Sequence, residues 1–498
     1  MAEEPTAHSP SVWRYARASR VHVVIDAAPY FALMQQALMR ARQRIMMIGW
    51  DFDTRILLGQ GRRWWNLPDK LAYPARLGPF VSWLCKRTKG LEVRVLKWNF
   101  GAFKFIFRGS MILDLYRWWR NPAIDFKFDS AHPLGCSHHQ KIVVIDDRFA
   151  VCGGIDMTAG RWDTPEHKEA DLRRRLPYSP RLFGPWHDLT LMVEGAAATA
   201  LGDLGRERWQ QAGGKPMAPC APQVSSPWPS ALKADFEDVE VGISRTRSHW
   251  NTVCEVREIE ALFLEHIARA RRFIYAESQY FASRVIAEAI ARRVAEPDPP
   301  EIVLINPLTA EGWLEVVAMD GARVRLAHAI RDVDHRQRFR IFVPYNAAGT
   351  PIYVHSKTMI VDDEILRIGS ANMNNRSLGL DSECDMFIDA ARPGNGHARA
   401  GITKLRHALL AEHLGLPRRE VEAALEQNPS MLALIENAPR RGKYLEPFAL
   451  RPLTETERAV ADNALLDPER PEELFEPISK RQGLFRRGSF LRRPRLEV

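Results

Sequence analysis

The sequence contains little cysteine and no long apolar run, and each absence excludes a class of protein. The six cysteines, at positions 85, 136, 152, 220, 254 and 384, form no CxxC pair, so neither a zinc site nor a disulfide framework is predicted. No stretch of about 18 uncharged apolar residues occurs, which argues against a transmembrane helix. The start, MAEEPTAHSP, is polar and acidic, unlike a secretory signal. We therefore expect a cytoplasmic protein with reduced thiols, although a non-Sec export route would leave no such mark.

Positive charge is in excess, with a formal net charge of +9. Such a balance favours anionic partners, either nucleic acid or a membrane of acidic lipids. A chain of 498 residues exceeds what one hydrophobic core usually covers, so two core units or a duplicated unit are expected.

An internal repeat supports duplication. ALMRARQRIMMI at 37–48 and HIARARRFIYAE at 266–277 both read as a basic helix end followed by a buried strand, and a further apolar strand follows each, at 91–98 and 301–308. Strands that alternate with amphipathic helices indicate an α/β fold with parallel or mixed sheets. Residues 213–230 are dense in Pro, Gly and Ser, as in a linker. We predict a first lobe at 1–212, a linker at 213–235, a second lobe at 236–415 and a helical extension with a basic tail at 416–498.

The basic tail covers 480–498 and holds seven Lys or Arg, at 480, 481, 486, 487, 492, 493 and 495. Leu484, Phe485, Phe490 and Leu491 are interleaved with them. This composition suits either a solvated, disordered end or a segment that contacts an anionic bilayer. Aromatic and basic residues also mix at 62–65 and 104–120, where packing on the lobe and contact with a membrane are equal alternatives.

The strongest signal is an H-x-K-x4-D pattern that occurs twice, with the same offset between the copies at all three positions: His139, Lys141 and Asp146, then His355, Lys357 and Asp362. A period-two spacing places His and Lys on one face of a strand, and the apolar residues that follow anchor that strand. One neutral imidazole can attack phosphorus while its twin, protonated, donates to the leaving oxygen. The two lysines stabilise the charge on the non-bridging oxygens, and the two aspartates are assigned to structural pairing.

The segments after the two motifs differ. The second continues as IGSANMNNRSLG, in which Ser370, Asn372 and Asn374 offer donors to a phosphate, and Gly154 lies in the corresponding turn of the first half. Asp156 stands where the second half has Asn372, so the pocket is asymmetric, with Arg161 as the expected neutralising partner of Asp156.

These motifs, together with GGID, GRWD, PWHD (185–188), ESQYF (277–281) and GSANxNxRS, resemble the phospholipase D superfamily, in particular its eukaryotic phosphatidylcholine-hydrolysing type. The likeness covers residues 20 to 415. It implies two pseudo-twofold α/β lobes around one shared active site, hence a monomer with an internal pseudo-dimer, and neither metal nor cofactor. It also implies that His139 is the nucleophile, His355 the general acid, and that a carboxylate orients each histidine. By position these carboxylates are Asp171 and Glu383.

The resemblance predicts a phospholipase D that hydrolyses the distal phosphodiester of a glycerophospholipid through a phosphohistidine, releasing phosphatidic acid and a head-group alcohol, with transfer to other alcohols as a side activity. The alternatives are a phosphatidyltransferase similar to cardiolipin synthase, a nuclease of the same superfamily and a dead lipid-binding scaffold. Nucleic acid is disfavoured as a partner.

No lipid-binding module and no acidic calcium-ligand cluster is visible, so peripheral contact with an anionic membrane must come from the lobes, the tail or a partner. His138 is interpreted as a packing residue, and His187 as equally a packing or a functional one.

Overall fold

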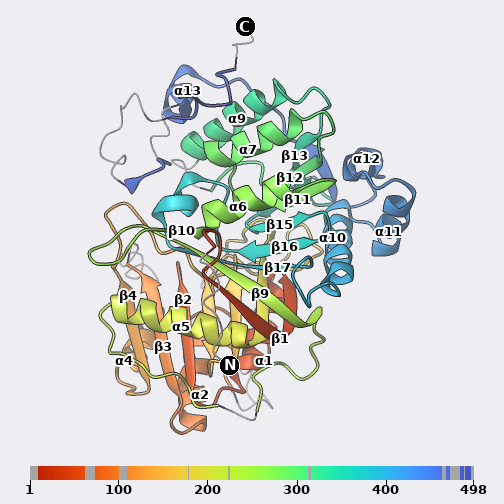
Figure 1. Ribbon diagram of the computed structural model, residues 1–498. Helices are drawn as coiled ribbons and strands as arrows, with labels where there is room; N and C mark the ends of the chain where they lie inside the picture. Colours follow the sequence, from red (N-terminus) through yellow and green to blue (C-terminus); the bar gives the residue numbers. More distant parts are fainter. Residues whose placement is uncertain are drawn as a thin grey trace.

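The computed structural model describes residues 9–61, 73–99, 109–177, 179–222, 225–311, 316–462, 467–471, 483–486 and 488–494. Two α/β lobes lie one above the other in Figure 1, the first in red to yellow and the second in green to blue. One sheet runs through both, in the order β18-β13-β12-β11-β15-β16-β17-β9-β1-β8-β6-β5-β2-β3-β4. The mixed α/β fold class that the sequence predicts is confirmed.

The strands of the first lobe are β1 (Arg14–Ile25), β2 (Arg44–Gly49), β3 (Glu92–Trp98), β4 (Ile124–Asp129), β5 (Ile142–Ile145), β6 (Phe149–Gly153) and β8 (Leu189–Gly195). Its helices are α1 (Ala27–Leu38), α2 (Leu77–Arg87), α4 (Met111–Trp119) and α5 (Ala196–Gln211). The strands β2, β3 and β4 run parallel, whereas β5, β6 and β8 are antiparallel to their neighbours.

The second lobe repeats this arrangement with β9 (Phe236–Arg247), β11 (Phe273–Glu277), β12 (Glu301–Ile305), β13 (Phe339–Tyr345), β15 (Thr358–Val361), β16 (Ile365–Gly369) and β17 (Glu383–Asp389). Its helices are α6 (Glu258–Arg269), α7 (Arg284–Val294), α9 (Gly321–Arg331) and α10 (Ala398–Leu414). Outward from the central antiparallel pair of β1 and β9, the two lobes show matching strand orders, which gives the sheet a pseudo-twofold axis.

The core follows the period of two along the strands. On β2, Met46 and Ile48 face a core that also contains residues of α5 and α10 and extends across both lobes. Ile45 and Met47 face the opposite side, where α1, α2 and α4 build a separate core. Because both faces of the sheet are covered, central strands such as β5 (IVVI) are apolar at every position rather than at alternate ones.

The segment between α5 and β9 has neither helix nor strand in its described residues, 212–222 and 225–235, and it passes along the first lobe. The Arg44 guanidinium donates to the carbonyl of Ala218 at 2.8 Å, and Trp228 packs edge-on against Phe149. The prediction that residues 213–235 form a linker between the two lobes stays a prediction.

The part of the chain after residue 415 is not only helical. It contains α11 (Arg418–Gln427), α12 (Met431–Asn437) and α13 (Glu455–Asp462), but also β18 (Tyr444–Pro447), which pairs with β13 and extends the sheet. None of the described helices is both long and apolar enough to cross a membrane.

The described residues of the tail, 483–486 and 488–494, pack on the second lobe. Leu484 and Leu491 are buried in the core that α6, α7 and α9 share, and Phe485 and Phe490 pack against that core. Burial in the protein core has removed Leu484 and Leu491 from solvent, so these two side chains are not available to a bilayer. Contact between the rest of the tail and an anionic membrane stays a prediction. Arg486 pairs with Glu469 at 2.6 Å, while Lys480, Arg481, Arg487 and Arg495 lie outside the described residues.

Candidate active site

The two His-x-Lys segments lie where the lobes meet. His139 and Lys141 are extended residues immediately before β5, and His355 and Lys357 stand between β14 (Tyr353–Val354) and β15. Their backbones pair with the opposite lobe: the His139 N–H donates to the carbonyl of Ser382 at 2.9 Å, and that of His355 to the carbonyl of His187 at 2.8 Å. The strands therefore begin one residue after each lysine, later than the sequence predicts, because contacts between the lobes replace sheet pairing there.

Each histidine is held by a carboxylate from the other lobe. His139 Nδ1 lies 2.9 and 3.1 Å from the two carboxylate oxygens of Glu383, the first residue of β17. His355 Nδ1 lies 2.7 Å from Asp188, which precedes β8. Both carboxylates are buried. With Nδ1 engaged as a donor, Nε2 is the nitrogen of each ring left to react with a substrate.

The assignment of Asp171 as an orienting carboxylate was wrong. Asp171 instead accepts from the guanidinium of Arg173 at 2.6 to 3.1 Å, and Asp188 takes the position next to His355. The connection between the last two strands of the repeat spans residues 154–188 in the first half and 370–382 in the second, so counting residues from the histidine misplaced the carboxylate. The PWHD sequence and the strand that follows it were the signal that could have identified Asp188.

Burial dominates the electrostatics of the site. It raises the pKa of Glu383 to about 8 against the charge of Lys141, and the pKa of Asp188 to about 7 against that of Lys357. Burial, followed by the charges of Lys141 and Lys357, holds the pKa of His139 well below its ordinary value. The pKa of His355 is also held well below its ordinary value, by burial and then by the charges of Lys357 and Arg161. Each imidazole is therefore neutral before an anionic substrate enters, as an attacking nitrogen must be.

The two lysines have different neighbours. Lys141 Nζ donates to the carbonyl of His139 at 2.7 Å and lies 3.4 Å from Asp156. Lys357 Nζ donates to the side-chain oxygen of Gln279 at 3.2 Å, and burial lowers its pKa to about 7. The predicted asymmetry of the pocket is thus seen as a lysine beside a carboxylate in one half and a lysine beside an amide in the other.

The expected pairing of Asp156 with Arg161 was wrong. Asp156 instead pairs with Lys141 and accepts from the backbone N–H of Trp50 at 3.1 Å. The Arg161 guanidinium stacks on Trp186 at 4.2 Å, and Trp186 in turn packs against the His355 ring at 5.2 Å. Arg161 therefore places a third cation beside His355, a position that the sequence did not predict.

The residues predicted to donate to a phosphate bond mainly to other groups of the protein. The Ser370 hydroxyl donates to Glu383 at 2.5 Å, and Asn374 accepts the backbone N–H of Ser377 at 3.2 Å. Asn372 is buried, and its amide donates weakly to Gln279 at 3.5 Å. At Gly154 an added Cβ would lie 2.0 Å from Asp188, so this glycine makes room for the orienting carboxylate. Only Asn372 keeps the environment expected of a substrate ligand.

Sequence reasoning also missed Ser377 and Gln279. The Ser377 hydroxyl donates to Glu383 at 2.7 Å, which together with Ser370 satisfies the carboxylate. Gln279 joins Lys357 to Tyr353, whose hydroxyl accepts from the Gln279 amide at 2.9 Å. Gln279 lies within the ESQYF stretch, which carried the resemblance but showed no chemistry from sequence alone.

Asp146 and Asp362 close the turns after β5 and β15, beyond the ends of the strands. Asp146 accepts three backbone N–H groups of residues 42–44 at 2.7 to 2.8 Å. Asp362 does the same for residues 271–273 at 2.7 to 2.9 Å. Both have a φ of 54°, a left-handed conformation that Asp tolerates better than most residues. The third residue of each motif thus fixes the hairpin to the neighbouring strand.

His138, the neighbour of His139, bonds to other groups than Glu383 and Asp188. Its Nδ1 lies 2.8 Å from the Ser382 hydroxyl and its Nε2 3.1 Å from Asp129, and burial lowers its pKa to about 4. This environment is that of a neutral histidine packed inside the protein, as the sequence analysis interprets it.

Comparison with known proteins identifies the sequence family of this chain. A family model described as phospholipase D matches residues 37–288 and 339–455. The chain belongs to the phospholipase D family. It is 25% identical over 471 residues to phospholipase D A of Dictyostelium discoideum, covering 80% of this chain and 36% of that protein. It is 24% identical over 555 residues to phospholipase D alpha 1 of Carica papaya, covering 83% of this chain and 66% of the relative.

The chain therefore spans from about a third to two thirds of the length of these two phospholipase D relatives. Among solved structures, the phosphatidylserine synthase of Haemophilus influenzae superposes with a TM-score of 0.52 at 11% identity, covering 85% of this chain and 96% of that one. At that identity the likeness concerns the fold alone. The phospholipase D assignment thus rests on the sequence family.

Proposed function

We propose that this protein is a phospholipase D that hydrolyses the distal phosphodiester of glycerophospholipids. The observation that carries the proposal is the pair of histidines whose Nδ1 atoms are held by Glu383 and Asp188 from opposite lobes. The charges of Lys141 and Lys357 act on both imidazoles, so the two histidines and the two lysines form one group at the lobe interface. Two histidines and two lysines held in this way supply a nucleophile, an acid and positive charge for in-line displacement at phosphorus.

The proposed reaction has two displacements. Nε2 of His139 attacks phosphorus, the bond to the head-group oxygen breaks, and His355 in its protonated form gives its proton to that oxygen. His355, now neutral, takes a proton from water, whose oxygen attacks phosphorus and breaks the P–N bond to release phosphatidic acid. Lys141 and Lys357 stabilise the non-bridging oxygens in both steps. The roles of the two histidines follow the family resemblance, since the geometry treats them alike.

Product analysis with two classes of substrate tests the proposal. Liposomes of phosphatidylcholine, phosphatidylethanolamine and an anionic lipid should yield phosphatidic acid and free head group. A primary alcohol added to the assay should yield the phosphatidyl alcohol, because a covalent intermediate can react with either acceptor. Plasmid DNA incubated in parallel should stay intact. DNA nicking without any lipid product would replace the proposal with a nuclease, and phosphatidyl transfer without hydrolysis would replace it with a transferase.

An exposed apolar surface on the first lobe supports a lipid substrate. Eight of the nine large apolar side chains exposed among the described residues lie between 112 and 182 in the first lobe, four of them on α4: Ile112, Leu113, Tyr116 and Trp119, at 49%, 58%, 53% and 79% exposure. Met111 and Trp118 on the same helix are buried against the lobe, so α4 carries apolar side chains both inward and outward. We propose that this outer face, with Arg117, lies on the bilayer surface. Residues 62–65 and 104–108 lie outside the described residues.

The variant L113S/W119S should bind anionic liposomes about tenfold more weakly, because it removes apolar area that would enter the interface. Cosedimentation at low salt measures the partition. Leu308→Ser serves as the matched control, since Leu308 is a comparably exposed leucine, at 40%, on the second lobe. Both proteins should hydrolyse a soluble short-chain substrate at the normal rate. Equal liposome binding by the two variants would remove α4 from the proposed membrane surface.

A further inference from the structure

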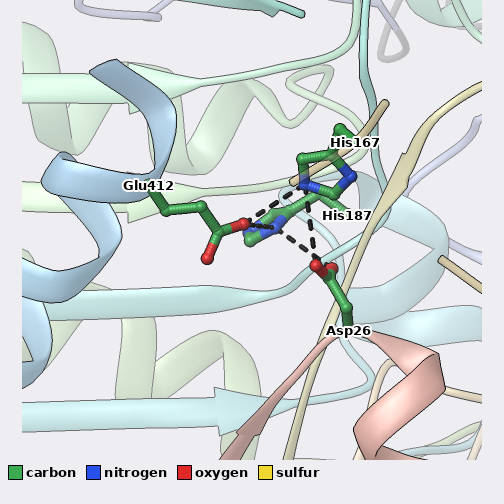
Figure 2. Close-up of side chains that lie close together, drawn as sticks. All are labelled: Asp26, His167, His187 and Glu412. Carbon is green, nitrogen blue, oxygen red and sulfur yellow. Dashed lines mark hydrogen bonds and ion pairs between the residues drawn. The ribbon is translucent and has the colours of Figure 1, made fainter. Parts of the chain in front are cut away.

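A second cluster of ligand-type side chains lies behind the active site. It consists of Asp26, His167, His187 and Glu412, and one ligand atom from each lies within 4.8 Å of the others. Figure 2 shows the two imidazoles and the two carboxylates converging on one point. Asp26 directly follows β1, His167 lies in the 154–188 connection and His187 is the last residue of β7 (Trp186–His187). Glu412 lies on α10, so three of the residues belong to the first lobe and one to the second. Asp26, His167 and His187 are fully buried.

The spacing within this cluster fits a tetrahedral metal ion. His187 Nδ1 lies 2.9 Å from Glu412 Oε1 and 3.3 Å from Asp26 Oδ1, while His167 Nε2 lies 3.2 Å from the same Glu412 oxygen and 3.6 Å from Asp26 Oδ2. Ligands about 2.0 to 2.1 Å from a tetrahedral zinc ion stand about 3.3 Å apart. The separations of the two imidazole nitrogens from Glu412 Oε1, and of His167 Nε2 from Asp26 Oδ2, therefore lie on either side of the value that a shared ion would impose.

Hydrogen bonding does not account for all the atoms that face the centre. His187 Nδ1 and Asp26 Oδ2 are buried and make no hydrogen bond, although they lie among opposite charges. A buried polar atom without a partner is costly, and native proteins rarely leave one unsatisfied. A cation at the centre would coordinate both atoms.

The outer nitrogens of the two histidines are held as metal ligands usually are. His167 Nδ1 lies 2.9 Å from Asp163, and His187 Nε2 lies 3.0 Å from Glu277. A carboxylate that accepts the outer N–H fixes the tautomer, leaving the inner nitrogen unprotonated and directed at the metal. With both imidazoles neutral, one divalent ion balances the charges of Asp26 and Glu412.

We propose that this cluster binds one structural zinc ion. Two imidazoles and two carboxylates in tetrahedral array suit Zn²⁺, whereas Ca²⁺ and Mg²⁺ require six or more oxygen ligands. Four protein ligands in a buried setting leave no open position for substrate, which is typical of a structural site. This site is independent of the proposed lipase chemistry, which routes no step through a metal.

The position of the site indicates a structural role for the ion. The Asp26 N–H donates to the carbonyl of Asp188 at 2.8 Å, and the Asp188 N–H donates back to the Asp26 side chain at 3.2 Å. The carbonyl of His187 accepts the N–H of His355 at 2.8 Å. An ion held by Asp26, His187 and Glu412 therefore joins α10 of the second lobe to the two segments that carry the Asp188–His355 pair.

Metal analysis of the full chain, without a histidine tag and purified without chelators, tests the proposal. Inductively coupled plasma mass spectrometry should find about one zinc per chain. His167→Gln and Glu412→Gln should lose it. His266→Gln is the matched control, because His266 is another fully buried histidine outside the cluster and this variant should keep its zinc.

Cobalt spectra of the wild-type protein test the site without any substitution, so the test holds even where a variant fails to fold. Wild-type protein stripped of metal and loaded with Co²⁺ should show the intense visible bands of tetrahedral cobalt, and one equivalent of Zn²⁺ should abolish them. Thermal unfolding should shift to higher temperature when Zn²⁺ is returned. Folded wild-type protein that carries no zinc, and takes up neither Co²⁺ nor Zn²⁺ in stoichiometric amount, would show that the four residues form only an ion-pair cluster. Because the readout is metal content, this result is separate from any failure of head-group release.

Discussion

His139→Ala and His355→Ala are each expected to lower kcat for head-group release by about 10⁴-fold or more, because nucleophile and general acid serve the same displacement. The double variant should be no worse than either single one, since two groups that act as a unit are not additive. Release of choline from phosphatidylcholine measures kcat with a head-group oxygen that needs a proton to leave, unlike an activated chromogenic head group. A quench followed by mass spectrometry should show the peptide around His139 carrying the phosphatidyl group, or the glycerophosphoryl group that remains after alkaline loss of its acyl chains, and the peptide around His355 if the roles are reversed.

His138→Asn provides the control for the two histidine variants. His138 is the direct neighbour of His139, but its ring bonds to Ser382 and Asp129 rather than to Glu383 or Asp188. This variant should unfold at lower denaturant concentration while the folded fraction turns over normally. More than about 1% of wild-type kcat in either His139→Ala or His355→Ala would overturn the two-histidine mechanism.

The second large effect separates Asp188 from Asp171. Asp188→Asn should reduce kcat by about 10³- to 10⁴-fold with little change in KM, because an amide in that place holds the imidazole in the wrong tautomer. Asp171→Asn should stay within about twofold of wild type, since its partner is a surface arginine and solvent screens that pair. Equal losses in both variants would contradict the assignment of Asp188.

The pH profile gives an independent readout of the same pair. Burial raises the pKa of Asp188 to about 7, so the carboxylate is protonated below that pH and accepts the His355 N–H less well. Wild-type kcat should therefore fall as the pH drops through about 7, and Asp188→Asn, which has no carboxylate to titrate there, should lack that component. An unchanged acid limb in Asp188→Asn would assign the limb to another group.

The sequence by itself determined the fold class and the repeated motif. Strands such as Ile142–Ile145 are apolar at every position, which predicts burial on both faces, and the constant offset between the motifs already implies two copies of one hairpin. The apolar strand and each copy of the motif are local features, since each depends on residues within a few positions of one another, and the offset follows from comparing two such segments. The lysines and aspartates of the motif follow from the same local pattern.

Only the tertiary structure decided which groups meet between the lobes. Glu383 reaches His139, and Asp188 reaches His355, across an interface whose partners are far apart along the chain. Spacing along the chain carries no information on such pairs, because the connection at 154–188 has no counterpart of equal length in the second half. The same reason hid the residues at 26, 167, 187 and 412, since a metal site assembled from four separate segments has no ligand spacing to read. The tail likewise shows an amphipathic composition in sequence, and only the packing of Leu484 and Leu491 shows that its apolar side faces the protein.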